Sequence, residues 1–443
     1  MAKIKIQYDC LTLMHKLLFF ILLLTTPCYS APLSLTELIS MALENNPETK
    51  AAWWNAQRAA ANLGEARSTL YPTLSAQGTL SHNRTYKFPT SEEVTFSEAG
   101  AQLLFTYLLF DCGERSASVQ AAQAALRAAG WQRDQVFQGV ISDVVARTYE
   151  YLDAEAVLSA RLASLKESEN VMQSTSELQR LGLKSITDLQ FLQASYSDMQ
   201  IGIAEQRSLV EINRGRLARA LGLSAETLLD IASLPEPVEY ILEGDAAQLI
   251  AQAQQMRSDL SVRRELLAEK NALVVKAEMS GAPKLRFNGD AGLKHYWHDK
   301  SDGAIYNAQL VLEVPLFKGF ETTYQRALSY AAAREEGYGI EKLLLDISLE
   351  VWTAIKRVEA AQEIWKAAGV NLTNSQSVYQ GIFDKYRAGA QSIFDLTTSQ
   401  NIATEARIKY TQAKTRWYSA LAELAYALGT LSQFAEVSCP ASE

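Results

Sequence analysis

The chain has 443 residues, 48% of them hydrophobic, which is enough for a large core or for several domains. Its formal net charge is −8, and residues 1–30 contribute +2, so residues 31–443 carry −10. This acidic balance disfavours a nucleic-acid-binding surface, because such surfaces neutralise phosphates with Lys and Arg.

Residues 1–30 have the pattern of a secretory leader. Basic residues come first, the apolar run Leu17–Leu24 follows, and small residues stand where a signal peptidase reads. The apolar run is far shorter than the roughly 20 residues of a membrane-spanning helix, so we expect a signal peptide. A lipid anchor on Cys28 is the alternative. The later cysteines, Cys112 and Cys439, lie in unrelated contexts, and we expect both thiols to be unpaired.

Past the leader, the hydrophobic period changes from helical to two residues and back to helical. We expect two short helices, two strands joined by a polar loop, and two long helices, over residues 33–46, 47–70, 73–80, 99–109, 113–179 and 186–221. At 1.5 Å per residue, the first long helix would measure on the order of 100 Å. Gly182 lies between the two long helices, which predicts a tight turn between antiparallel helices.

The second half of the chain repeats the first. Before the strands the two copies align at a shift of 211 residues, which pairs Leu38 with Leu249. After the strands the shift is 207, which pairs Gly182 with Gly389. The change of length falls inside the strand–loop–strand region, where loops tolerate it. The proline-rich segment Ser233–Pro237 separates the two copies.

We therefore expect a mainly α-helical chain with two internal repeats, each made of helix, β-hairpin, long helix and helix. The expected boundaries are a signal peptide at 1–30; a first repeat at 31–232, with its hairpin at about 73–110 and long tunnel helices at about 113–221; a linker at 233–245; a second repeat at 246–430, with its hairpin at about 284–317 and tunnel helices at about 320–429; and a C-terminal tail at 431–443.

The second hairpin alternates most cleanly between polar and apolar residues. The apolar residues, which include Leu285, Leu293 and Leu310, fall on one face, so each strand has one apolar face. The strands approach the length of a tilted bilayer-spanning strand, about 9 to 11 residues, and aromatic residues lie near their ends as in interfacial girdles. The polar parity consists of Arg286, Asn288, Asp290, Lys294, Asn307, Gln309 and Glu313.

A membrane location for these strands would require an oligomer. Strand edges cannot face lipid, and only a closed barrel removes them. Four strands are too few, since the smallest bacterial barrels have about eight, whereas a trimer supplies about 12. The long helices would continue the barrel as a tube roughly 100 Å long. The seven polar residues just named would line the barrel lumen, and the turns at Gly182 and Gly389 would form the distal mouth.

Several short motifs occur in a fixed order along the chain after the leader. They are Leu35-Thr36-Glu37-Leu38, Ala42-Leu43-Glu44-Asn45-Asn46-Pro47, Tyr71-Pro72, Pro315-Leu316-Phe317-Lys318-Gly319, Tyr386-Arg387-Ala388-Gly389 with Asp395-Leu396, and Ala427-Leu428-Gly429. Together with the internal duplication, this order resembles the TolC family of outer-membrane efflux and secretion channels over essentially the whole chain after the leader.

The resemblance implies a homotrimer in the cell outer membrane, in contact with its lipid. It implies a 12-stranded transmembrane β-barrel, an α-helical tunnel across the periplasm and a mixed α/β belt at mid-height. The implied partners are a periplasmic adaptor protein and an inner-membrane pump of the RND or ABC type. The implied function is a passive exit duct of a tripartite efflux or type I secretion system, for small molecules or proteins.

The resemblance also assigns roles at the distal turns. In the family an aspartate matching Asp395 constricts a periplasmic gate, and Asp188 holds the equivalent place in the first repeat. Carboxylates favoured by a helix N-terminus are the simpler alternative for both. Gln391 stands where the best-known relative has a locking arginine, Thr398 stands where a second acidic residue occurs, and Tyr386 is a latch or a packing residue. The adaptor-docking tips would be the turn glycines and their neighbours: Gly182, Leu183, Ser185, Gly389, Ala390 and Ser392.

We find no catalytic constellation in the sequence. His82, His295 and His298 all lie in the hairpins without an accompanying set of ligands, so we expect no metal site. No glycine-rich phosphate loop follows a strand, and we expect no cofactor and no enzymatic activity. A soluble periplasmic coiled-coil adaptor or scaffold is the main alternative to the duct. An exported enzyme is the second alternative, and it would need a convergent polar site.

Overall fold

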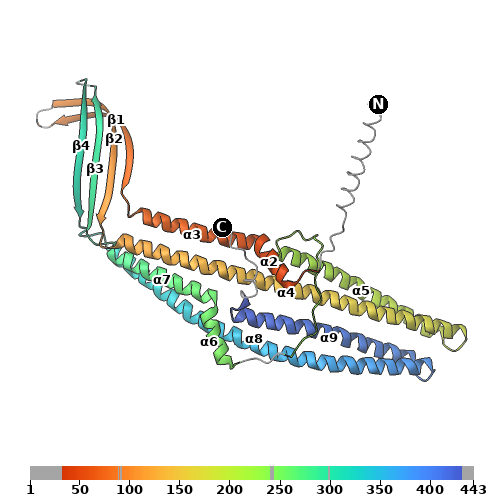
Figure 1. Ribbon diagram of the computed structural model, residues 1–443. Helices are drawn as coiled ribbons and strands as arrows, with labels where there is room; N and C mark the ends of the chain where they lie inside the picture. Colours follow the sequence, from red (N-terminus) through yellow and green to blue (C-terminus); the bar gives the residue numbers. More distant parts are fainter. Residues whose placement is uncertain (1–31, 88, 90–91, 240–243, 298–299, 432–443) are drawn as a thin grey trace, which may run out of the picture.

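The computed structural model describes residues 32–87, 89, 92–239, 244–297 and 300–431. The molecule is elongated, with a four-stranded sheet at one end and two helical turns at the other (Figure 1). The expected signal peptide with Cys28, the histidine His298 and the tail from residue 432 with Cys439 lie outside the described residues.

The described part of the first half of the chain contains four helices and two strands. The helices begin and end within two residues of their predicted positions, so this part of the prediction is confirmed. The elements are α2 (Leu35–Asn45), α3 (Pro47–Ser68), β1 (Thr73–Lys87), β2 (Glu92–Phe110), α4 (Glu114–Arg180) and α5 (Ile186–Ala220).

The predicted polar loop between the first two strands is wrong. β1 and β2 extend through this segment as a paired ladder, from Ser81 opposite Glu98 to Lys87 opposite Glu92. The sequence here has no continuous apolar face, so the two-residue period is lost. Backbone hydrogen bonds nevertheless continue the ladder, because antiparallel pairing does not depend on side-chain polarity.

The second half of the chain repeats the order of elements. Helix by helix, the lengths equal those of the first half, at 11, 22, 67 and 35 residues. The strands differ, because β1 and β2 have 15 and 19 residues whereas the later two have 13 each. The elements are α6 (Ala246–Met256), α7 (Ser258–Met279), β3 (Lys284–Tyr296), β4 (Ser301–Glu313), α8 (Glu321–Arg387) and α9 (Ile393–Ala427).

Side-chain caps determine where several helices begin. Ser34 forms a capping box with the third residue of α2, and Asn46 caps α3, whose first residue is Pro47. Ser392 and Asp395 form a further capping box at the start of α9. These side chains satisfy amide groups that a helix N-terminus leaves unpaired, so short sequence signals fix the turns of the chain.

Two successive left-handed residues connect each hairpin to its 67-residue helix. Cys112 and Gly113 precede α4 with φ angles of 57° and 95°. Gly319 and Phe320 precede α8 with φ angles of 60° and 65°. Such residues redirect the backbone between the extended and the helical conformation. The sheet accordingly stands at an angle to the helices (Figure 1).

The sheet has the strand order β1-β2-β3-β4, and each neighbouring pair is antiparallel. A register shift interrupts the β2–β3 ladder between Leu108 and Phe110. Within one chain, β1 and β4 are therefore the two edge strands of the described sheet. Each has one row of backbone groups with no strand beside it.

The helices form two sets that share α4 and α8. Toward the sheet the packing order is α3, α4, α7, α8. Toward the distal turns the order is α5, α4, α9, α8. Both long helices therefore run the whole distance from the sheet to the turns, and the shorter helices lie beside them (Figure 1).

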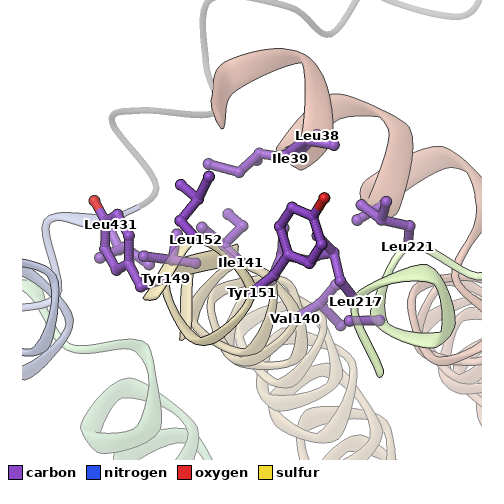
Figure 2. Close-up of a cluster of buried hydrophobic side chains, with 14 residues drawn as sticks. Leu38, Ile39, Val140, Ile141, Tyr149, Tyr151, Leu152, Leu217, Leu221 and Leu431 are labelled. Atoms are coloured by element: carbon purple, nitrogen blue, oxygen red, sulfur yellow. The ribbon is translucent and has the colours of Figure 1, made fainter. Parts of the chain in front are cut away.

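The main hydrophobic core lies at mid-length, where α2 packs on α4 and on the end of α5 (Figure 2). Leu38, Val144 and Leu217 are fully buried there. A second cluster, which includes Ile347 and Trp417, joins α6, α8 and α9 in the same way. Burial of these side chains attaches the short helices to the long ones, at roughly 25 cal/mol for each Å² of apolar surface removed from water.

At mid-length, the end of α5 also docks on the junction between α2 and α3. The side-chain amide of Asn46 donates to the carbonyl of Ala220 at 2.9 Å. Gly222 follows with a φ of 76°. A Cβ added to Gly222 would lie 2.7 Å from the carbonyl carbon of Asn45, so the two backbones are in close contact. In the second half Arg257 takes the place of the asparagine and donates to a carbonyl of α9.

The segment between the two halves lies against α9, as far as it is described. Leu33 and Ile231 form an isolated parallel bridge. Glu236 accepts hydrogen bonds from Tyr410 at 2.8 Å and from Lys414 at 3.0 Å. The resemblance implies a mixed α/β belt at mid-height. This connecting segment, together with α2 and α6, would supply that belt.

Candidate functional site

One face of the sheet carries all seven residues that the sequence assigns to a lumen. In the β3–β4 ladder, Asn288 stands opposite Gln309 and Asp290 stands opposite Asn307. Residues of one parity share a face, and the register joins the polar parity of β3 to that of β4. The same register places the other three on this face: Arg286, Lys294 and Glu313.

The first hairpin adds polar residues that the sequence analysis did not assign to the lumen. The ammonium group of Lys294 lies 3.0 Å from a carboxylate oxygen of Glu98 on β2. The amide of Gln102 donates to Gln77 on β1 at 3.4 Å. The two-residue period of β1 is a signal that identifies Gln77, whereas Leu104 interrupts the polar face on β2.

The opposite face of the sheet is apolar and exposed in the single chain. Leu74, Leu103, Leu293 and Leu310 come from the four strands in order, and each is more than half exposed. The strand register places them on the same face, together with Tyr306. A continuous apolar surface of this kind is typical of contact with lipid or with another protein.

The two distal helical turns have the same backbone geometry. Gly182 and Gly389 adopt φ angles of 75° and 77°. The amide after each glycine donates to a carbonyl five residues earlier, at 2.9 Å, which is the hydrogen bond of a Schellman motif. The predicted glycine turns between antiparallel helices are therefore confirmed.

Both turns present exposed residues to the outside. Leu181, Ile186 and Phe394 add apolar side chains that the sequence analysis did not single out, and each is more than half exposed. Their apolar character beside a predicted turn is the signal that identifies them. The six predicted tip residues are all exposed: Gly182, Leu183, Ser185, Gly389, Ala390 and Ser392.

Tyr386 joins the two helical hairpins near the turns. Its side chain is 1% exposed and packs with Val171 of α4 and Leu192 of α5. Its hydroxyl lies 3.1 Å from that of Thr175 on α4. The ammonium group of Lys184, in the other turn, lies 3.9 Å from the centre of its ring.

The phenol of Tyr386 stays protonated in this position. Burial raises its pKa, the hydrogen bond with Thr175 opposes that shift, and the nearby Asp188 carboxylate adds to it. The hydroxyl therefore remains available as a donor. Tyr386 is thus a packing residue that also makes a polar contact between the two halves of the chain.

Asp395 caps the helix in which it lies. Its carboxylate accepts from the hydroxyl of Ser392 at 2.6 Å, and its own amide donates back to that hydroxyl at 3.1 Å. Asp188 is half-buried in the first turn of α5. Ser185 caps that helix, and its hydroxyl accepts a hydrogen bond from the amide of Thr187. Within one chain, the simpler helix-terminus role therefore accounts for the contacts of Asp395.

Among the residues that the structure describes, neither of the other two predicted gate residues joins the two turns by a side-chain hydrogen bond or ion pair. Gln391 is half-buried and Thr398 is exposed. A third contact between the halves lies further from the turns, where Arg407 of α9 pairs with Glu167 of α4 at 3.0 Å and donates to Ser164. The structure thus brings Tyr386 of α8 into contact with α4 and α5 of the other half, and places Gln391 in the second turn and Thr398 in α9.

The described ranges contain no group of three or more His, Cys, Asp and Glu side chains that could hold a metal ion. His295 bonds to Asp302 at 2.7 Å, and His82 bonds to Ser97 at 2.7 Å. The thiol of Cys112 forms no disulfide with any residue that the structure covers. Among the described helices, none combines the length and the apolar character needed to cross a membrane.

Comparison with known families assigns most of the chain. Residues 38–223 and 249–430 match the family model described as outer membrane efflux protein. The two matched segments correspond to the two halves of the structure, and the gap between them falls on the connecting segment.

Individual outer-membrane proteins are also similar to this chain over most of its length. The chain is 26% identical over 405 residues to the protein CyaE of Bordetella pertussis, covering 88% of this chain and 83% of that protein. It is 20% identical over 418 residues to the outer membrane protein TolC of Escherichia coli, covering 90% and 83%.

Solved structures share the fold. The outer-membrane channel OprN superposes with a TM-score of 0.81 at 18% identity, over 89% of this chain and 90% of that chain. The open state of the MtrE outer membrane channel of Neisseria gonorrhoeae gives a TM-score of 0.77 at 20% identity, over 90% and 89%.

Proposed function

This chain belongs to the outer membrane efflux protein family, and we propose that three copies of it close into a single duct. The chain is an outer-membrane exit channel with a periplasmic extension. The alternative of a soluble periplasmic adaptor or scaffold is therefore set aside. The relatives are channels rather than enzymes, and we assign no catalytic activity to this chain.

The observation that carries the trimer is the incomplete sheet. Its apolar face is exposed across all four strands, and both β1 and β4 are edges. In a bilayer each unpaired backbone group costs several kcal/mol, so these edges must pair with other strands. Head-to-tail pairing of β4 with β1 of a neighbouring copy, repeated three times, closes a barrel of about 12 strands.

The same closure gives the duct its interior. The polar face with Asn288, Asp290 and Lys294 then lines a wet lumen, and the apolar face with Leu293 and Leu310 contacts lipid. The long helices continue the barrel as an α-helical tunnel of roughly 100 Å. We assign the polar sheet residues to the lumen, the exposed turn residues to adaptor docking, and the two halves to two copies of one structural unit.

The duct needs partners that supply energy and cargo. In this proposal a periplasmic adaptor contacts the exposed turns, and an inner-membrane pump of the RND or ABC type drives small molecules or proteins into the tunnel. Leu181, Leu183 and Phe394 give the turns the exposed apolar surface that such docking needs.

Channel formation is tested with the purified full-length chain in planar lipid bilayers. We expect stepwise conductance, and a mass in detergent equal to three chains. A monomeric mass together with the absence of any conductance would contradict the proposal. Conductance with a different number of chains would retain the duct and correct the stoichiometry.

We expect the substitution Asp395→Asn to weaken block of this conductance by a trivalent cation, by roughly tenfold. Three copies would place three carboxylates in a narrow constriction, where charges interact strongly because water is scarce. Asparagine keeps an oxygen for the hydrogen bond with Ser392, so the cap should survive. Block is measured as the cation concentration that halves the current.

The matched control is Asp188→Asn, the same change at the equivalent place of the first half. A smaller effect there would assign the constriction to the second half alone. Unchanged block after Asp395→Asn would leave Asp395 with its helix-capping role only.

A further inference from the structure

The internal contact between α4 and α7 has no counterpart for the other pair of equivalent helices. α3 packs on α4 as α7 packs on α8, and α4 and α7 join the two pairs. The equivalents of α4 and α7 are α8 and α3, which lie at opposite edges of the packing order (Figure 1). The α4–α7 contact is called here the internal seam. The outer faces of α3 and α8 are the two sides of an equivalent contact, the open seam, which one chain cannot form alone.

The sequence offsets between the two halves, 207 and 211 residues, identify the residue pairs of the open seam that are equivalent to pairs of the internal seam. In the internal seam Arg127 of α4 pairs with Glu265 of α7 at 2.9 Å. The residue 207 positions after Arg127 is Arg334 of α8, and the residue 211 positions before Glu265 is Trp54 of α3. An indole thus stands where the internal seam has a carboxylate.

The surface around Arg334 is shaped for such a side chain. A groove of about 430 Å³ lies between α7 and α8, with Arg334, Tyr330 and Tyr338 on its wall and Ala333 and Gly337 as small residues. The guanidinium donates to the hydroxyl of Tyr330 at 2.8 Å and lies 5.3 Å from the centre of that ring, so it is held beside an aromatic side chain. Aromatic faces attract a guanidinium in this arrangement.

Trp54 is available to enter the groove of another molecule. Its side chain is 66% exposed, which is unusual for the largest apolar residue. It lies at the far edge of the packing order from Arg334, so the two residues of one copy do not meet.

We propose that Trp54 of one copy of this chain inserts beside Arg334 in the groove between α7 and α8 of the next copy. The inference rests on the proposed duct, and adds to it the contact that joins the helical parts of neighbouring copies. The occupant is a second copy of this chain, because the internal seam supplies the geometry.

Two further pairs of the internal seam translate into compatible pairs. Lys276 donates to Ser118 at 3.3 Å in the internal seam, and the equivalent residues are Glu65 and Gln325, a carboxylate and an amide. Ser258 donates to Gln138 at 3.3 Å, and the equivalent residues are Pro47 and Leu345, both apolar. Leu345 is 73% exposed in the single chain, as expected for a side chain that a neighbour covers. None of the three translated pairs sets like charges against each other.

The test is a charge series at position 54 in the purified full-length protein. Trp54→Lys sets an ammonium against Arg334 and should weaken association by about tenfold per interface, equal to about 1.4 kcal/mol. Trp54→Glu recreates the Arg127–Glu265 pair between copies and should keep the assembly. The double change Trp54→Lys with Arg334→Glu sets an ammonium against a carboxylate and should restore the assembly. The readout is the mass in detergent over a dilution series, with helix content as the check on folding.

Trp53→Lys is the matched control, because it makes the same change one residue away. The ring of Trp53 contacts that of Trp54 edge-on at 4.7 Å, but its equivalent in the internal seam is Arg264, an exposed cation, so this variant should lose far less association than Trp54→Lys does. Assembly of Trp54→Lys equal to that of the wild type, or loss of assembly in Trp54→Glu as large as in Trp54→Lys, would overturn the contact. A wild-type protein that is monomeric in the same dilution series would instead contradict the trimer.

Discussion

Replacing Gly222 with alanine is expected to lower the free energy of unfolding by roughly 3 kcal/mol. Left-handed backbone costs a residue with a Cβ about 1–2 kcal/mol, and Gly222 has a φ of 76°. The new Cβ would also meet the backbone of Asn45 at 2.7 Å, and overpacking of this kind costs about 1–3 kcal/mol. Backbone atoms cannot rotate away as a side chain can. Thermal unfolding followed by circular dichroism measures the loss.

Gly182→Ala is the matched control for this prediction. Gly182 has nearly the same φ, 75°, but an added Cβ would meet nothing within 4 Å. It should therefore show only the conformational cost, about 1–2 kcal/mol. Equal losses in the two variants would mean that the contact with Asn45 relaxes without cost, and that the mid-length junction is not rigid.

Tyr386→Ala is expected to open the distal mouth. Truncating a buried aromatic side chain costs about 3 kcal/mol or more, and here the lost contacts join the two helical hairpins. If the hairpins separate when the mouth opens, the closed form alone bears this cost. The ratio of closed to open channels should then fall by roughly two orders of magnitude. Mean conductance and open lifetime in planar bilayers measure the change.

The polar part of this contact is separated by smaller substitutions. Tyr386→Phe and Thr175→Val each remove one hydroxyl of the pair at 3.1 Å, and each should favour opening by about 1 kcal/mol. The double variant should do no more than either single one, because the two hydroxyls form one hydrogen bond. Additive effects would show that the hydroxyls act separately, and a closed channel in Tyr386→Ala would remove Tyr386 from the gate altogether.

The helices were predictable because their signals are local and continuous. The helical period runs unbroken to the turns, Pro47 begins α3, and the turn glycines end the long helices. The capping box at Ser392 and Asp395 is also visible as a short spacing in the sequence. Its presence favours the structural role of Asp395, which the sequence analysis held as the alternative.

The contacts between distant segments were not predictable in the same way. Nothing local links Tyr386 to Thr175 or Lys184, which lie about 200 residues earlier. The glycine at 222 reads from the sequence as a helix stop, and its contact with Asn45 becomes visible only when α5 returns to α2. The polar ladder beyond Ser81 was missed because no core lies behind it to impose a period.

The equal lengths of α4 and α8, and of α5 and α9, mean that the depth to which the channel reaches is encoded twice in one chain. A deletion of seven residues from α4 alone would draw one turn back by roughly 10 Å and leave its partner in place. The rim would become uneven, with alternate high and low turns around the mouth. Adaptation to a cell envelope of different thickness therefore requires coordinated insertions or deletions in four helices, and single changes of length are confined to the hairpins.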